Sequence, residues 1–173
     1  MKTLAEIHRA EGINLHGRTV HRMAARAVIL RGRDLLMVYS SNVGDYKFPG
    51  GGVDTDETHE HALARELLEE CGATLLSVDG ELGAVIEYNF PVEKDFDVFK
   101  MTSHYYWCKI KDGIFSEQKL DDYEKDLGFT PAWVDIDEAI QKNKSLQNVS
   151  DPPKWLNREN FVLEYINATV LRR

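Results

Sequence analysis

Cysteine is scarce in this sequence, and its scarcity restricts the kinds of site that the chain can build. Cys71 and Cys108 are the two cysteines among 173 residues. Two thiols so far apart in the sequence supply neither a disulfide framework nor a cysteine-ligated zinc site. We expect both to be reduced thiols in a cytoplasmic protein.

Long hydrophobic runs are absent as well. Residues 1–20 do not contain the apolar run of a signal peptide, and no stretch approaches the roughly 18 apolar residues of a membrane span. The sequence therefore predicts a soluble cytoplasmic protein without a membrane partner.

Positive charge is in deficit, because 21 Lys and Arg stand against 29 Asp and Glu, a formal net charge of −8. No segment concentrates Lys and Arg into a block, so we expect no nucleic-acid partner. If the substrate is also anionic, a cation must screen its repulsion from the protein.

The predicted elements indicate a mixed sheet covered by helices. A length of 173 residues with 43% hydrophobic residues suits one domain with a sizeable core. Residues 1–18 look like a polar arm with a short helix at 3–10, and 116–130 like a loop or short helix. Strands are predicted at 21–30, 34–41, 74–90, 99–110 and 131–136, and helices at about 57–71, 135–142 and 153–171. The strands at 74–90 and 99–110 are expected to be neighbours.

The segment 51–73 is unusual because it holds seven carboxylates and one Arg. On a helical wheel Glu66, Glu69 and Glu70 share an arc of about 100°. The other side carries the aliphatic residues Leu63, Ala64, Leu67 and Leu68 together with Cys71. We expect the helix to bury that aliphatic face and to present the carboxylates outward. They form either a solvated acidic face or a site for Mg²⁺ or Mn²⁺, which prefer oxygen ligands.

A glycine-rich loop precedes this helix and favours the metal interpretation. The sequence Phe48-Pro49 is followed by Gly50, Gly51 and Gly52. Glycine lets the backbone approach a ligand closely. The loop and the carboxylate helix together are typical of a metal–phosphate site.

The segment resembles the signature of the Nudix hydrolases, G-x5-E-x7-R-E-U-x-E-E-x-G-U, where U is aliphatic. The fixed positions are all present, and Ala73 stands where a larger aliphatic residue is usual. They are Gly51, Glu57, Arg65, Glu66, Glu69, Glu70 and Gly72. The signature covers residues 51–73, and the likeness in element order extends over 20–145.

The resemblance implies an α+β fold, a Nudix-type α/β/α sandwich with a central mixed sheet. The expected organisation is an N-terminal arm at 1–18, the Nudix hydrolase domain at 19–145, and a C-terminal linker and helix at 146–173 packing on the same domain. It also implies a Mg²⁺- or Mn²⁺-dependent hydrolase acting on a nucleotide-type small molecule. Water would attack phosphorus and cleave a diphosphate bond in a nucleoside diphosphate linked to another group.

The resemblance also assigns roles to residues of the signature. Glu66 and Glu70 are expected to bind the metal, and Glu69 to join them directly or through water. The carbonyl of Gly50 or Gly51 completes the shell. Arg65 is expected to orient a glutamate of the signature, and Glu57, near the helix start, to be structural.

The general base is expected in the acidic loop beyond the signature. Glu124 is the preferred residue because its loop precedes the strand and helix at 131–142. Glu117, Asp121 and Asp122 are alternatives, and Glu69 is a further one.

Substrate contacts are expected from cations and from the glycine loop. The candidates for phosphate are Arg26, Arg31, Lys47 and Lys100, with Gly50 and Gly51 beside them. Aromatic residues at strand positions belong more often to the core than to a base-stacking site; these are Tyr88, Phe90, Tyr105, Trp107 and Trp133. His59 and His61 lie about 200° apart on a helix, so they cannot chelate one ion.

The substrate remains open at this point. The short chain favours a housecleaning (d)NTP pyrophosphohydrolase. An ADP-ribose or nucleotide-sugar pyrophosphatase, to which Pro91 is a loose match, and a dinucleoside polyphosphate hydrolase are alternatives. A non-catalytic nucleotide sensor is disfavoured by the intact glutamates, and an isomerase using Cys108 by the intact signature. We expect a homodimer.

Overall fold

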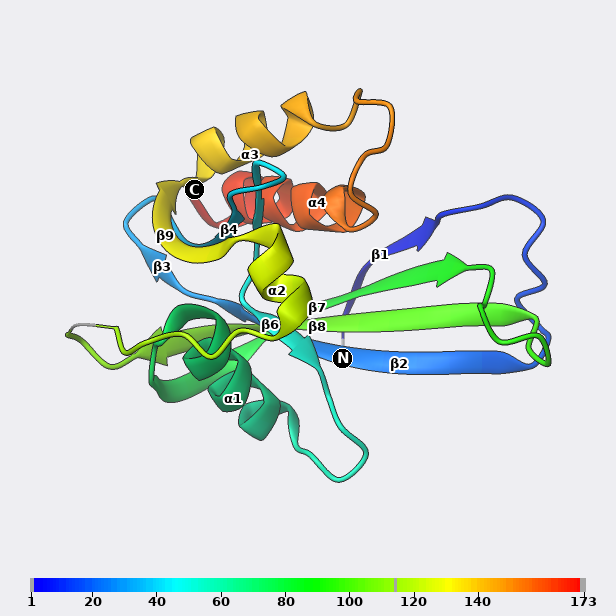
Figure 1. The fold of residues 1–173 in the computed structure, drawn as a ribbon, viewed down its shortest axis with the longest axis horizontal. Coiled ribbons are helices and arrows are strands. Elements are labelled where there is room, and N and C mark those ends of the chain that lie inside the picture. Colours follow the sequence, from blue (N-terminus) through cyan, green and yellow to red (C-terminus); the bar gives the residue numbers. More distant parts are fainter. Residues whose placement is uncertain (1, 114, 172–173) are drawn as a thin grey trace.

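The computed structural model describes residues 2–113 and 115–171, which form two sheets (Figure 1). The larger has the strand order β1-β7-β8-β2-β6, and β3, β4 and β5 form the smaller, with β9 paired to β4. The strands of the larger are β1 (Thr3–His8), β2 (Thr19–Val28), β6 (Gly50–Gly52), β7 (Leu75–Asn89) and β8 (Val98–Ile110). Those of the smaller are β3 (Leu30–Arg31), β4 (Asp34–Ser40), β5 (Asp45–Lys47) and β9 (Phe129–Asp135).

The larger sheet is mixed, as the sequence predicts. β1 pairs with β7 and β2 with β8 in parallel, whereas β7 pairs with β8 and β2 with β6 antiparallel. The predicted neighbours at 74–90 and 99–110 are therefore confirmed as the antiparallel pair β7 and β8.

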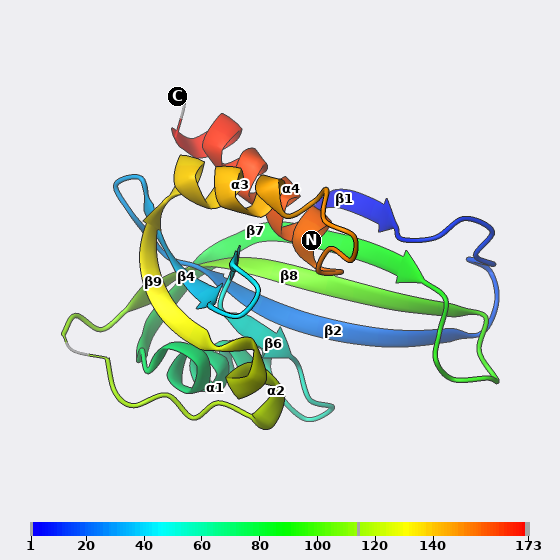
Figure 2. The same ribbon diagram turned by 45° about the horizontal axis from the view of Figure 1, so that its top comes forward.

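Helices cover the sheets from two sides, which gives the expected α/β/α arrangement (Figure 2). They are α1 (His59–Cys71), α2 (Asp122–Leu127), α3 (Ile136–Ser145) and α4 (Leu156–Ile166), the last followed by a π-helical turn at Asn167–Leu171. One core cluster packs under α1 around Leu63 and Leu67, and another under α3 and α4 around Ile136 and Leu163. In the described part of the chain no helix is both long and apolar enough to cross a membrane.

The short helix predicted at 3–10 is wrong, because this segment forms strand β1. β1 runs parallel to β7, with Glu6 opposite Ile86 and His8 opposite Tyr88. Leu4 and Ile7 pack against the core under α4. The pairing along the edge of β7 supplies hydrogen bonds and tertiary contacts, whereas a short polar helix with little to pack against is marginal in water. The domain boundaries at residues 18 and 145 stay a prediction.

Helix α1 differs from the wheel-based prediction in one respect that matters for the site. Its expected outward carboxylates are wrong for Glu66 and Glu70, which are only 8% and 5% exposed, whereas Leu68 is 39% exposed. The helix packs against β6 and β2, so its buried face includes the edge that carries both glutamates. Thr58 caps its N-terminus, and Gly72 ends it in a left-handed conformation at φ 66°.

Candidate functional site

Three carboxylates converge where α1 meets α2. Glu66, Glu70 and Glu124 each place an oxygen within 4.8 Å of the other two. The first two lie one turn apart on α1, and Glu124 comes from α2, much later in the sequence. One Glu124 oxygen accepts the backbone N–H of Asp121 (2.8 Å) in a capping box that fixes this glutamate on its helix.

The glycine loop allows β6 to approach these carboxylates. The N–H of Gly50 donates to Glu70 Oε2 at 2.7 Å. A Cβ at Gly51 would lie 2.3 Å from Glu66 Oε1, so a side chain there would displace that carboxylate. Gly50 adopts φ +132°, which disfavours other residues, and its Cβ would meet the Ala25 carbonyl oxygen at 2.1 Å. The packing of β6 against β2 therefore requires Gly50, and the position of the Glu66 carboxylate depends on Gly51.

Burial makes the cluster a strong potential binder of cations. Burial raises the pKa of Glu70 to about 8, although Lys47 opposes the rise. Burial also raises the pKa of Glu66 and of Glu124. The three carboxylates repel one another and are partly stripped of water, so a bound cation would stabilise their charged forms. An all-oxygen set of this kind suits Mg²⁺ or Mn²⁺.

Arg65 contacts Glu66, one of the three converging carboxylates, and also Glu57. Its Nη1 donates to Glu66 Oε1 at 2.7 Å, and its Nε donates to Glu57 Oε1 at 2.9 Å. Glu69 accepts a longer bond from Arg65 (3.3 Å) and is not among the three converging carboxylates. Arg65 is thus placed to orient Glu66. The expected metal-binding role of Glu69 stays a prediction and gains no support from this position.

Two basic side chains, Lys47 and Arg26, line a cavity of about 360 Å³ together with the carboxylates. Lys47 is only 9% exposed, and its side-chain ammonium has no hydrogen-bond or ion-pair partner in the described part of the chain. Its Nζ lies 3.7 Å from the centroid of the Phe129 ring. Arg26 Nη1 donates to the Gly50 carbonyl at 2.8 Å, while its buried Nε finds no partner among the described residues. These unsatisfied donors are suited to an anion in the cavity.

The other predicted phosphate ligands lie elsewhere. Arg31 pairs with Asp112 at 3.0 Å and its guanidinium lies 4.3 Å from the centroid of the Trp133 ring. Neither Arg31 nor Lys100 lines the cavity. Of the alternative bases, Asp121 lines it and caps α2, whereas Glu117 and Asp122 do not.

The aromatic residues that line the cavity are not those considered from the sequence. Tyr105 is fully buried and packs edge-on against Phe48, and none of the five predicted aromatic candidates lines the cavity. Tyr123, Phe129 and Trp155 do so instead. They come from α2, β9 and the turn before α4, which only the tertiary fold brings together.

His59 contacts Tyr106 and His104. Its Nδ1 lies 2.6 Å from the Tyr106 hydroxyl, and its ring lies 4.6 Å from that of His104. That His59 and His61 cannot chelate one ion stays a prediction.

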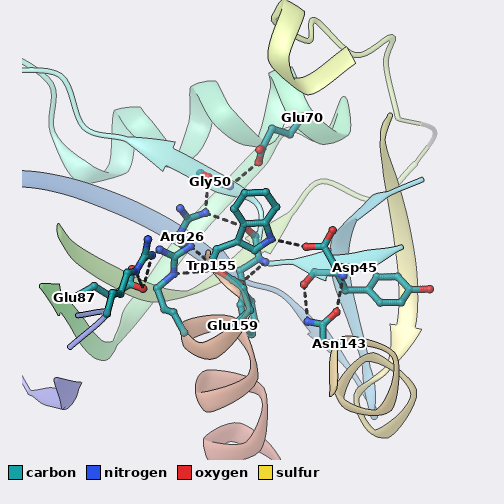
Figure 3. A network of polar contacts seen from close by, with 12 residues as sticks. Arg26, Asp45, Gly50, Glu70, Glu87, Asn143, Trp155 and Glu159 are labelled. Carbon is teal, nitrogen blue, oxygen red and sulfur yellow. Dashed lines mark hydrogen bonds and ion pairs between the residues drawn. The ribbon is translucent and has the colours of Figure 1, made fainter. Parts of the chain in front are cut away.

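A buried ion-pair network supports the cavity from the other side (Figure 3). We call it the C-terminal network; it consists of Arg9, Glu87, Arg158 and Glu159. Glu87 accepts from Arg158 Nη1 at 2.6 Å and from Arg9 Nε at 3.0 Å. Glu159 accepts from Arg158 Nη2 (2.8 Å) and from the N–H of Phe48 (3.0 Å), two residues before Gly50. This network was not predicted from the sequence, because no local pattern identifies pairs so far apart in the chain.

Comparisons with known proteins identify the family of the chain. The family model described as NUDIX domain matches residues 20–156. An RNA pyrophosphohydrolase of Sulfurovum sp. (strain NBC37-1) is 34% identical over 100 residues, which are 56% of this chain and 62% of that protein. One of a Nitratiruptor species is 34% identical over 85 residues, 47% of this chain and 52% of that protein. The match thus spans less than two thirds of either relative.

Solved structures show the same fold at low sequence identity. A NUDIX hydrolase from Nitrosomonas europaea has a TM-score of 0.55 and 20% identity, covering 86% of this chain and 90% of that one. The E. coli ORF135 protein has a TM-score of 0.53 and 18% identity, covering 87% and 93%. The family match covers most of the chain, includes the signature, and agrees with the α/β/α arrangement. The chain therefore belongs to the Nudix hydrolase family.

Proposed function

We propose that this protein is a hydrolase that uses a divalent cation to cleave a diphosphate bond in a nucleotide-type substrate. The observation that carries the proposal is the presence of two kinds of charge in one cavity. Glu66, Glu70 and Glu124 converge there, and the unpartnered groups of Lys47 and Arg26 line the same cavity. A phosphate chain with a bound cation complements both sides.

The carboxylates fit a hard divalent cation. Glu66 and Glu70 would hold Mg²⁺ or Mn²⁺, because both are buried and are fixed by Arg65 and by the Gly50 N–H. When bound, the ion would polarise phosphoryl oxygens and lower the pKa of an attacking water. Lys47 and Arg26 would bind the phosphate oxygens and stabilise the negative charge that develops on them.

Glu124 is the best-placed proton acceptor for the attacking water. It is more exposed than Glu66 and Glu70, and burial raises its pKa. The capping box engages one of its oxygens and leaves the other for the cavity. Glu69 is the weaker alternative, because Arg65 binds it outside the cluster.

The substrate is expected to be a nucleoside 5′-di- or triphosphate derivative. The housecleaning (d)NTP reaction is one form of this chemistry, and an ADP-ribose or nucleotide-sugar substrate is another. A second candidate is the 5′-triphosphate end of RNA, which the names of the curated relatives favour. That candidate would replace the expectation of no nucleic-acid partner. A homodimer stays a prediction.

Chromatographic detection of the cleavage products under saturating Mg²⁺ would test the proposal, because ADP-ribose and nucleotide sugars release neither phosphate nor pyrophosphate. The panel contains the common (d)NTPs, 8-oxo-dGTP, ADP-ribose, a nucleotide sugar, a diadenosine polyphosphate and a short 5′-triphosphorylated RNA. We expect turnover of one class, lost in EDTA. Nucleotide binding without turnover of any member would instead indicate a sensor.

A matched pair of variants separates the two candidate bases. Glu124→Gln should lower kcat by about 10²-fold or more with little change in KM, because it removes a proton acceptor. Glu69→Gln should lower kcat by less than about tenfold, because this residue would only support Arg65. The reverse order would assign the base to Glu69.

A further inference from the structure

A second cavity of about 540 Å³ adjoins the one that holds the carboxylates. We call it the apolar groove and define it by Val43, Val149, Pro152 and Pro153, with Tyr123 and Trp155 at its inner end. Tyr123 and Trp155 line both cavities. A molecule whose phosphates lie between Lys47 and the glutamates can therefore extend into the apolar groove only past these two rings.

Trp155 is held firmly at this junction. Its indole Nε1 donates to Asp45 Oδ2 at 2.5 Å, and Asp45 is fully buried. Lys47 Nζ lies 4.9 Å from the centroid of the Trp155 ring. Figure 3 shows Trp155 between Gly50 and Asp45. Because its orientation is fixed before any ligand arrives, little conformational entropy is lost when a planar group packs against it.

Tyr123 offers a complementary surface from α2. It is 56% exposed, and among the described residues it does not stack on another aromatic ring. Its helix also carries Glu124, so the residue that lines the groove is adjacent in sequence to the proposed base. An exposed ring that continues an apolar surface beside a reaction centre is suited to a ligand that covers it.

A third cavity also borders the catalytic one, and its lining is more polar than that of the apolar groove. It shares Arg9 with the catalytic cavity and Pro152, Pro153 and Lys154 with the apolar groove, and it is lined further by His8, Asn89, Gln147, Leu156 and Asn157. A nucleoside has one flat apolar part, the base, which favours aromatic surfaces over amide groups. Because both cavities share the prolines, Tyr123 and Trp155 are what make the apolar groove the better match for a base.

We infer that the apolar groove binds the nucleobase of the substrate, packed against Tyr123 and Trp155, while its phosphates occupy the catalytic cavity. This inference rests on the proposed function, because it takes the phosphates to lie beside Lys47. Asn42, the amide in the groove, already donates to the Asp126 carbonyl at 2.8 Å. Asp151 and Lys154 also line the groove and can bond a base edge. A purine offers more stacking area to Tyr123 and Trp155 than a pyrimidine does, so purines bind more tightly than pyrimidines.

Equilibrium binding tests the inference independently of turnover. Isothermal titration measures AMP, UMP and inorganic pyrophosphate against the full chain in the presence of Ca²⁺. AMP should bind several-fold more tightly than UMP. Tyr123→Leu should weaken AMP by about tenfold, as expected for the loss of one stacking ring, and Tyr123→Phe should not. Pyrophosphate, which has no base, should bind both variants as it binds the wild type.

Two further variants test whether the effect is specific to the apolar groove. Val149→Trp fills the groove at an exposed position and should weaken AMP but not pyrophosphate. Asn157→Leu replaces an amide in the lining of the polar cavity without adding bulk and should change neither. Unchanged AMP affinity in both Tyr123→Leu and Val149→Trp, or a loss in Asn157→Leu alone, would overturn the groove assignment. If AMP binding depends on Tyr123 but the protein hydrolyses no diphosphate, the assignment of the groove to the nucleobase is supported and the proposed function is rejected.

Discussion

Two groups of buried charges meet at the cavity, and they differ in how far their charges are compensated. In the C-terminal network both oxygens of Glu87 accept bonds from arginines, and Glu159 is likewise engaged by Arg158 and by a backbone N–H. Around Glu70 the compensation is incomplete, and burial raises its pKa to about 8. A buried network in which every charge is paired is expected to stabilise the fold. A buried carboxylate whose charge is not fully compensated is expected to bind a ligand.

The two groups are joined through one short segment of backbone. Glu159 holds the N–H of Phe48, and the Gly50 N–H, two residues later, is held by Glu70. Arg26 binds the Gly50 carbonyl between them. The paired network therefore fixes the loop against which the undercompensated carboxylates are arranged. Mutations in the C-terminal network should therefore mainly lower stability, whereas mutations of the undercompensated carboxylates should mainly lower activity.

The largest effect is expected for Glu70→Gln. Replacing a proposed metal ligand should lower kcat/KM by about a thousandfold, comparable with the loss of a strong electrostatic contact at a reacting group. The fold should persist, because the amide oxygen of Gln can still accept from the Gly50 N–H. Thermal melting checks the fold and the metal assignment: Mg²⁺ should raise the Tm of the wild type over that in EDTA and should leave the Tm of the variant unchanged. An equal Mg²⁺ response in both proteins would exclude Glu70 as a ligand.

Glu159→Gln should show the opposite pattern, with stability as the main loss. Removing one charge from a buried, hydrogen-bonded pair leaves Arg158 undercompensated and should cost about 3 kcal/mol of unfolding free energy. Glu164→Gln on the same helix is the control, because its pair with Lys144 is half exposed and should cost less than about 1 kcal/mol. Urea unfolding measures both. Equal losses would mean that the C-terminal network contributes no more than a surface pair.

Gly51→Ala tests whether the site depends on the close approach of β6. The added methyl would lie 2.3 Å from Glu66 Oε1, so the carboxylate must move. A displacement near 1 Å should lower kcat by about a hundredfold. Gly52→Ala is the matched control, since its Cβ meets nothing within 4 Å and its kcat should stay near that of the wild type. Similar rates for the two variants would show that Glu66 tolerates displacement.

The carboxylate cluster that includes Glu66 and Glu70 could be predicted from the sequence far better than the C-terminal network. The spacing of Glu66 and Glu70 on one helix, and the glycines before it, are local features that survive any tertiary arrangement. Their burial was not predictable, because a helical wheel does not say which neighbour will cover the polar edge. The helical wheel predicts that Glu66 and Glu70 point outward, whereas packing against β6 buries them.

Long-range pairs lie outside what a single sequence can indicate. Glu87 and Arg158 are separated by 71 positions, and each reads locally as an ordinary charged residue. Strand β1 was mistaken for part of a polar arm because its partner β7 lies some 80 positions away, as Thr3 opposite Ala84 illustrates. Trp155 was missed for the same reason, since only Asp45 and Lys47 give it a place in the cavity.

The smallest effect is expected at His59, a half-buried group that belongs to neither charged cluster. Burial, with a further contribution from His104, lowers its pKa below the ordinary value, although Glu81 opposes. Protonation is therefore easier in the unfolded chain, and stability should fall as pH decreases through the region below about 6.5. His59→Gln should flatten this part of the profile, and His61→Gln, at an exposed position, should not. Melting temperatures at pH 7.5 and 5.5 measure the difference. If both variants keep the acid sensitivity of the wild type, a neutral His59 bound to Tyr106 contributes nothing to it, and the sensitivity must come from other titrating groups.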